Sequence, residues 1–290
     1  MSDNFALLRS VLYTPGSNQK AIDKIATFPV DGVILDLEDA VSPSQKGAAR
    51  ENVAKTLSTM KFRSHMVSVR INPLESDWGK EDLHAICEHP LNAIVIPKVN
   101  FARDIEEIAE SLARKPQTSD TRIWAMIETP DAVLNAKEIS CAPKLAGLIM
   151  GTNDLSSELE CSMDSERAAL STALQNCVLA ARSSGIRILD GVYNKFKDLE
   201  GLEQECRQGR EFGFDGKTLI HPAQVGIANK VFSPTPEEID LARARIDAFE
   251  EAAKNGSGIA VVDGSIVENL HVRAARKVID KLSKIEGYES

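Results

Sequence analysis

Two carboxylates, Glu128 and Asp154, each follow a short apolar run of the kind that forms a buried strand, residues 123–127 and 145–150. If these strands are parallel neighbours, both side chains meet at one edge of the sheet. Carboxylate oxygens are hard ligands that suit Mg²⁺ or Mn²⁺, and only His221 among His and Cys is expected nearby, which argues against zinc. The pair therefore predicts a magnesium or manganese site; the alternative is a purely structural role.

A second acidic group, Asp36, Glu38 and Asp39, follows another apolar run. Alternation along an extended chain puts Asp36 and Glu38 on the same face. Arg70, at the end of the next run, offers a planar guanidinium that binds a carboxylate at two points. We expect it to hold a substrate carboxylate, or alternatively to form an ion pair with Asp36 or Glu38. Lys98 is expected to neutralise the acidic group.

These side chains form one site only if their elements converge. Eight short apolar runs alternate with segments of helical periodicity, as expected of parallel strands buried on both faces. This pattern predicts an α/β fold, a (β/α)8 TIM barrel, whose functional groups lie at the C-terminal ends of the strands. The rival, an open doubly wound sheet, would need a Gly-x-Gly-x-x-Gly turn after the first run, and none is present. The predicted strands are residues 10–13, 32–37, 66–71, 93–99, 123–127, 145–150, 186–189 and 217–220.

The barrel is expected to span residues 1–232, and residues 233–290 a C-terminal helical extension. Helical periodicity in the barrel covers, among other segments, 45–59, 101–114, 165–184 and 198–212. In the extension we expect a helix over 234–253 capped by Ser233 or Thr235, an extended run at 259–263 that enters a turn, and a final helix over 267–282. Such an extension commonly serves oligomerisation or covers an active site.

Composition excludes several classes of protein. The 290 residues include 34 Lys and Arg against 43 Asp and Glu, a formal charge of −9. This excess of acid argues against nucleic-acid partners and against a membrane surface, both of which need a basic face. No apolar run approaches the ~20 residues of a membrane-spanning helix. The five cysteines are odd in number and form no Cys-x-x-Cys pair, a pattern typical of a reduced, cytoplasmic protein.

Several motifs together resemble one family. From residue 9 to about residue 279 the chain is similar to citrate lyase β-subunit-like (CitE-like) enzymes, the group of malyl-CoA and citramalyl-CoA lyases related to the HpcH/HpaI aldolases. Each motif alone is weak, and the set is specific. The motifs are GVILDLEDAV at 32–41, VRINP at 69–73, IPKV at 96–99, MIETP at 126–130 and FDGKTLIHP at 214–222.

The resemblance implies a (β/α)8 barrel that binds Mg²⁺ and a CoA thioester. Glu128 and Asp154 match the family's metal ligands, and Arg70 matches the arginine that holds the substrate carboxylate and stabilises an enolate. The acidic group at 36–39 matches a supporting cluster around the metal and Lys98. We expect the substrate also to contact Gly151, Thr152 and Asn153, although Asn153, like Asp39, can simply cap the following helix. Basic groups expected to meet the CoA phosphates are Lys20, Lys46 and Arg50.

Asp263, in the sequence Val-Val-Asp-Gly, separates the members of this group. It resembles the acid/base aspartate that reaches a neighbouring subunit, so the resemblance implies active sites shared within a homotrimer or a dimer of trimers. True citrate lyase subunits resemble Leu-Asn-Gly here, without the acid. Asp263 therefore favours a stand-alone enzyme over a subunit that uses an acyl-carrier protein; the alternative is an ordinary Asp-Gly turn.

We therefore expect a Mg²⁺-dependent carbon-carbon lyase that cleaves malyl-CoA or citramalyl-CoA to acetyl-CoA and a 2-oxo acid by retro-Claisen chemistry. A thioesterase acting on malyl-CoA at the same site is the first alternative. The others are a citrate lyase-type subunit acting on an acyl-carrier-protein thioester and a pyruvate aldolase that does not use CoA.

Overall fold

The chain forms two compact units in a computed structural model that describes residues 7–162 and 166–289. The first unit ends at Phe232 and the second begins at Ser233. Among the described residues, every helix is too short or too polar to span a membrane.

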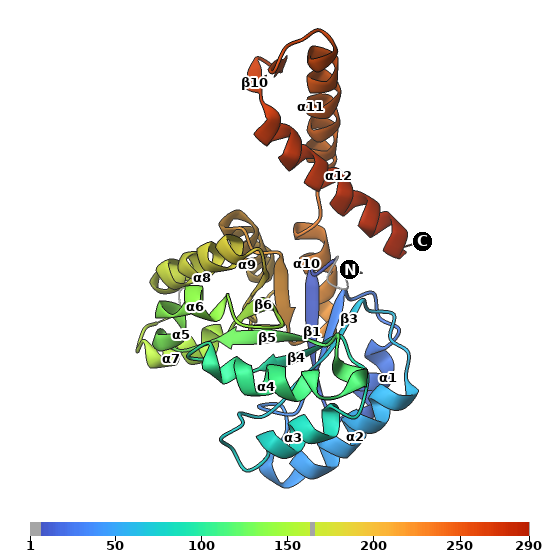
Figure 1. The fold of residues 1–290 in the computed structure, drawn as a ribbon, viewed down its shortest axis with the longest axis vertical. Coiled ribbons are helices and arrows are strands. Elements are labelled where there is room, and N and C mark those ends of the chain that lie inside the picture. The colour runs from blue at the N-terminus through green and yellow to red at the C-terminus, as the bar shows by residue number, and fades with distance from the viewer. Residues whose placement is uncertain (1–6, 163–165, 290) are drawn as a thin grey trace. The chain divides into compact units, whose positions relative to one another are not determined.

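The first unit is a closed barrel of eight parallel strands, in which each strand pairs with the next and β8 pairs with β1 (Figure 1). The (β/α)8 prediction is therefore confirmed. The sequence places the strands correctly because each is a short apolar run buried on both faces, a pattern that only an enclosed parallel sheet requires. The strands are β1 Ser10–Pro15, β2 Gly32–Asp36, β3 Met66–Arg70, β4 Ala93–Ile96, β5 Arg122–Ile127, β6 Leu145–Met150, β7 Arg187–Asp190 and β8 Gly216–Leu219.

Helices surround the barrel. The predicted helix over 165–184 is shorter than expected: its first residue, Ser165, lies outside the described residues, and α8 begins only at Ser171. Arg167 has a φ of 50°, in the left-handed region, so the chain turns there before a short 3₁₀ turn leads into the helix. The helices are α1 Gln19–Ile25, α2 Lys46–Thr59, α3 Gly79–Ile86, α4 Arg103–Ala113, α5 Pro130–Leu134, α6 Ala136–Ile139, α7 Thr152–Glu158, α8 Ser171–Ser184, α9 Leu199–Phe212 and α10 Val225–Val231.

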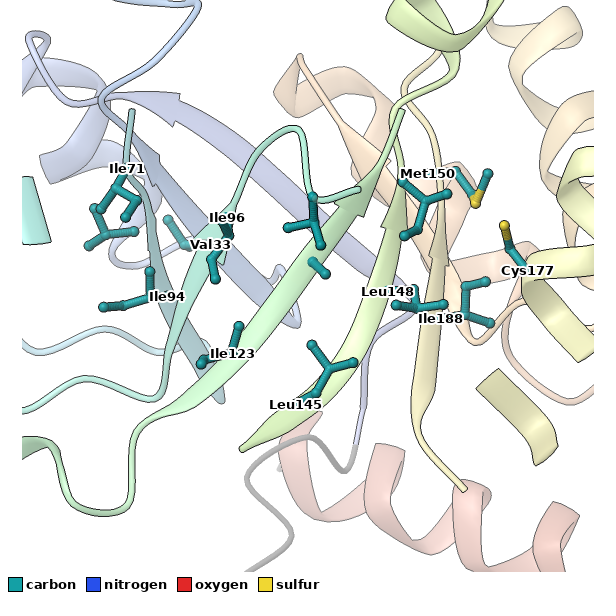
Figure 2. Packing of buried hydrophobic residues seen from close by; sticks show 14 of the residues in the cluster. Val33, Ile71, Ile94, Ile96, Ile123, Leu145, Leu148, Met150, Cys177 and Ile188 are labelled. Carbon is teal, nitrogen blue, oxygen red and sulfur yellow. The ribbon is translucent and has the colours of Figure 1, made fainter. Parts of the chain in front are cut away.

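Two apolar clusters stabilise the barrel. The larger lies between the strands and the helices, and Figure 2 shows part of it, with Leu148 and Ile188 of the sheet near Cys177 of α8. The second cluster includes Trp124, which is fully buried. A Cβ atom on Gly147 would lie 2.4 Å from the Trp124 ring, so this indole fits only because its neighbour on β6 is glycine.

A buried network of charges joins β7, β8 and α9. Asp190 accepts hydrogen bonds from Arg167 Nη1 at 2.7 Å and from Lys217 Nζ at 2.8 Å, and Lys217 also lies 2.7 Å from Glu205 Oε1. Asp190 is fully buried. Asp190 therefore helps to hold two strands and a helix together.

The second unit consists of two helices and a hairpin, α11 Pro236–Lys254, β9 Ala260–Val262, β10 Ser265–Val267 and α12 Asn269–Glu289. Thr235 caps α11 in a capping box with Glu238. Asp263 and Gly264 form the hairpin turn with φ values of 49° and 73°, as a two-residue turn of type I′ requires. The hairpin delays the last helix, which starts at Asn269 rather than at 267.

Lys217 provides a test of the buried network. Replacement by methionine leaves Glu205 and Asp190 with an uncompensated buried charge, so we expect the free energy of unfolding to fall by about 3–5 kcal/mol. Urea unfolding followed by circular dichroism measures this. Lys230→Met is the matched control, because Lys230 is exposed and 3.6 Å from Glu203, and it should change stability by less than ~0.5 kcal/mol. Equal effects of the two variants would contradict the interpretation.

Candidate active site

A cavity of about 280 Å³ lies at the C-terminal ends of the strands, where the sequence predicts the site. It brings together eight of the predicted residues. These are Asp36, Asp39, Arg70, Glu128, Gly151, Thr152, Asn153 and Asp154.

Arg70 is surrounded by carboxylates. Its Nε and Nη2 donate to the two oxygens of Asp36 at 2.7 and 2.6 Å, a bidentate pair. Its Nη1 lies 2.8 Å from Glu38 and 3.1 Å from Asp39. Of the two roles expected for Arg70, the structure therefore shows the ion pair with protein carboxylates. Asp39 is 72% exposed, and it is the partner that a ligand can replace most easily.

One guanidinium does not neutralise three carboxylates. Burial raises the pKa of Glu38 to about 8, although the nearby Arg70 opposes this shift and Asp39 adds to it. Glu38 therefore holds a proton at neutral pH in the absence of a ligand.

Glu128 lies deeper in the cavity. Its Oε1 accepts the backbone N–H of Lys98 at 2.6 Å, and burial raises its pKa to about 7, with a further contribution from Asp154. A Cβ atom on Gly151 would lie 2.3 Å from Glu128 Cβ and 2.5 Å from Glu128 Oε2. Because residue 151 has no Cβ atom, the Glu128 carboxylate can occupy this position. Gly151 thus has a positioning role in addition to its predicted contact with the substrate.

Asp154, in the first turn of α7, is half-buried, and no group of residues 7–162 or 166–289 donates a hydrogen bond to its carboxylate. Together with Glu128 it fits a hard divalent cation, because Mg²⁺ commonly takes one or two protein carboxylates and keeps positions for water and substrate. A zinc site requires at least three such protein ligands. Residues 7–162 and 166–289 contain no group of three His, Cys, Asp or Glu side chains that could hold a metal.

The expectation that Lys98 neutralises the acidic group is wrong. The ion pairs of this group are made by Arg70. Lys98 has a φ of 52°, its side chain is exposed, and it contributes its backbone N–H to Glu128. The left-handed backbone turns the amide toward the cavity, which a sequence pattern does not reveal.

Lys46 and Arg50 do not have the free cationic groups that a phosphate site needs. The Lys46 ammonium donates three hydrogen bonds, to the carbonyls of Leu37 and Glu38 and to Asn72 Oδ1, at 2.7–2.8 Å. Arg50 is paired with two acids of α3. Both contacts argue against the expected role in binding CoA. Lys20 is exposed at the start of α1, and its role stays a prediction.

The sequence missed Tyr13, Met126 and Asn194, which also line the cavity. Asn194 and Asn153 exchange side-chain hydrogen bonds at 2.7 and 3.3 Å, so Asn153 is held by a partner from the loop after β7. Alternation from Val11 along the first strand could have placed Tyr13 in the barrel interior.

Asp263 belongs to the second unit, where it is exposed at the hairpin turn.

Comparison with known families matches residues 9–222 to HpcH/HpaI aldolase/citrate lyase. The chain belongs to this family. The predicted resemblance is confirmed. This family member is 49% identical over 282 residues to (3S)-malyl-CoA thioesterase of Cereibacter sphaeroides, with 97% of each chain covered. It is 32% identical to citrate lyase subunit beta of Escherichia coli, over 94% of this chain and 92% of that one.

Among solved structures, this HpcH/HpaI family member is similar to CitE of Mycobacterium tuberculosis in complex with magnesium, acetoacetate and coenzyme A. The TM-score is 0.77 at 27% sequence identity, and the match covers 97% of this chain and 99% of that one. The similarity therefore extends over both units of the chain.

The raised pKa of Glu38 predicts how stability depends on pH. The folded protein holds a proton up to about pH 8 that the unfolded chain loses near its ordinary value of about 4.3. Without divalent metal, the free energy of unfolding should therefore fall as pH rises between these values. Glu38→Gln removes this titration, so its stability should depend less on pH, as measured by urea unfolding at pH 5, 7 and 8.5.

Glu106→Gln is the control for Glu38→Gln, because it makes the same substitution on the exposed surface of α4. It should follow the pH dependence of the wild type. Parallel curves for Glu38→Gln and the wild type would show that Glu38 does not hold the proton.

Proposed function

We propose that this protein is a Mg²⁺-dependent enzyme that acts on a β-hydroxyacyl-CoA with a second carboxylate, of the malyl-CoA type, and that it hydrolyses the thioester. The proposal is carried by the carboxylate pair Glu128 and Asp154 in the same cavity as Arg70. The magnesium and coenzyme A bound to the similar CitE structure support the choice of metal and carrier. The identity to a malyl-CoA thioesterase supports the choice of acyl group and reaction.

Glu128 and Asp154 are the residues that would hold the metal. Bound Mg²⁺ supplies Lewis-acid polarisation of substrate oxygens. Binding requires both carboxylates in their charged form, so Glu128 must lose the proton that burial favours. Its backbone hydrogen bond from Lys98 fixes one oxygen and leaves the other for the ligand.

Arg70 would bind the free carboxylate of the substrate. Asp36 holds one edge of the guanidinium and stays in place, while Glu38 and Asp39 occupy Nη1. The substrate carboxylate would replace Asp39, which is exposed, and then share Nη1 with Glu38. This exchange keeps the cation paired whether or not substrate is bound, so the cavity never holds an isolated guanidinium.

In hydrolysis, a water oxygen bonds to the thioester carbon, the carbon–sulfur bond breaks, and the proton of the water leaves with CoA, giving malate. The second candidate is retro-Claisen cleavage, in which the bond between the carbinol carbon and the thioester's α-carbon breaks. The hydroxyl proton is lost as this bond breaks, the oxygen's electron pair forms the carbonyl of glyoxylate, and the carbon–carbon electron pair leaves as an enolate, which is protonated at carbon to give acetyl-CoA. Asp263 favours this candidate, because protonation of carbon needs a positioned acid.

We infer that Asp263 acts in the cavity of a second copy of the chain, in a homotrimer or a dimer of trimers. Support comes from its exposed place in the second unit, beside the exposed apolar side chains of Val261 and Ile266. These side chains are 64% and 60% exposed, a state that burial in an assembly would relieve.

The test is a product assay with malyl-CoA and citramalyl-CoA, in the presence of Mg²⁺ and of EDTA. Free CoA with malate, released only with Mg²⁺, supports hydrolysis, whereas acetyl-CoA with glyoxylate or pyruvate supports cleavage. Glu128→Gln should lower metal-dependent kcat by at least about 100-fold because it removes a charged ligand. Glu106→Gln should leave it unchanged. Turnover that survives EDTA, or no turnover of either ester, contradicts the proposal.

Asp263→Asn tests the acid/base group separately. Asparagine suits a type I′ turn before glycine at least as well as aspartate does, so the hairpin should keep its conformation. For the cleavage reaction we expect a loss of kcat of about 100-fold or more, with an unchanged melting temperature and unchanged mass by light scattering. Asp240→Asn, on the exposed surface of α11, is the matched control. Wild-type activity in Asp263→Asn would remove Asp263 from the mechanism.

A further inference from the structure

Arg70 has a contact that differs in kind from its ion pairs. Its guanidinium carbon lies 4.8 Å from the centroid of the Tyr13 ring, within the distance at which a cation and an aromatic face attract each other. Tyr13 is on β1 and lines the cavity together with Arg70. Carboxylates therefore hold the edge of the guanidinium, and its central carbon lies over the face of the Tyr13 ring.

The two kinds of contact fix different motions. The bidentate pair with Asp36 sets where the guanidinium lies within its own plane, but a planar group can still tilt about the line of these bonds. Glu38 and Asp39 limit the tilt only while they occupy Nη1. When a ligand carboxylate takes the place of Asp39, the contacts with Asp36 and Glu38 remain at the edge of the guanidinium, and Tyr13 is the aromatic contact that remains beside it.

Met126 links the same two residues from a third strand. Its Sδ accepts a long hydrogen bond from the Tyr13 hydroxyl and another from Arg70 Nη1, both at 3.8 Å. The hydroxyl is thus directed at a thioether on β5. Burial raises the pKa of Tyr13 far above neutral, despite the opposing charge of Arg70, so the ring stays a neutral phenol and is no candidate for a general base.

We propose that Tyr13 is a positioning residue that fixes the plane of the Arg70 guanidinium, so that Nη1 is aligned for a ligand carboxylate. This inference rests on the proposed function in one respect, namely that Arg70 binds such a carboxylate. The face of the Tyr13 ring is the part that aligns the guanidinium. The Tyr13 hydroxyl serves only to orient the ring through its contact with Met126.

The experiment measures binding of malonate, a small dicarboxylate, by isothermal titration calorimetry with Mg²⁺. Tyr13→Leu keeps a half-buried apolar side chain but loses the aromatic face, and we expect it to weaken binding about threefold to tenfold. Tyr13→Phe keeps the face and should bind within about twofold of wild type. Tyr193→Leu removes a tyrosine whose hydroxyl bonds Asp198 instead, and its affinity should match wild type.

A double-mutant cycle identifies the residue through which Tyr13 acts. In an Arg70→Lys background, which lacks the planar group, Tyr13→Leu should weaken binding no further. An equal additional loss in that background would overturn the proposal, as would equal losses in Tyr13→Phe and Tyr13→Leu, or no loss in either. Circular dichroism melting curves check that each variant is folded.

The outcome separates this inference from the proposed function. Malonate binding with the expected pattern, but without turnover of any CoA thioester, would contradict the proposed function and support the role of Tyr13. Turnover of malyl-CoA, together with malonate affinities that Tyr13→Leu does not alter, would support the proposed function and contradict the role of Tyr13. Absence of malonate binding to the wild type would contradict both.

Discussion

The ion pair between Asp36 and Arg70 holds the site of this protein in place. The two residues are register partners at the ends of β2 and β3, so the pair lies where the two strands stop. The oxygens of Asp36 also accept the backbone N–H groups of Glu38 and Ala40 at 2.9 and 3.1 Å. One carboxylate therefore fixes both the guanidinium and the start of the loop that carries Glu38 and Asp39.

Charge balance explains the rest of the cavity. Acids at the ends of β2 and β5 and in α7 lie at the same end of the barrel as Arg70, and burial raises the pKa of two of them, Glu38 and Glu128. A low-dielectric space tolerates such an excess of acid only by holding protons or by binding a cation. Glu128 belongs to both groups, because burial favours its proton and its carboxylate would hold the metal, so metal binding at this site would release a proton.

Much of this site could be predicted because strand ends in a parallel barrel converge whatever the loops do. That rule was enough to bring Glu128 and Asp154 into one cavity. It fails where the outcome depends on details that a pattern does not contain. Lys98 turns outward because of a left-handed backbone, and Lys46 is buried because strand-end carbonyls need its donors. Tyr13 was missed because an aromatic side chain in a strand carries no chemical signal until its neighbour is known.

The size of the cavity has a consequence for how such enzymes diversify. At about 280 Å³, it lies at the lower end of the ~300–1,000 Å³ typical of sites for drug-sized ligands. It has room for a short acyl group and none for the nucleotide of a carrier. A thioester substrate of the proposed kind would therefore have its carrier recognised outside this cavity, by residues separate from those that hold the acyl group.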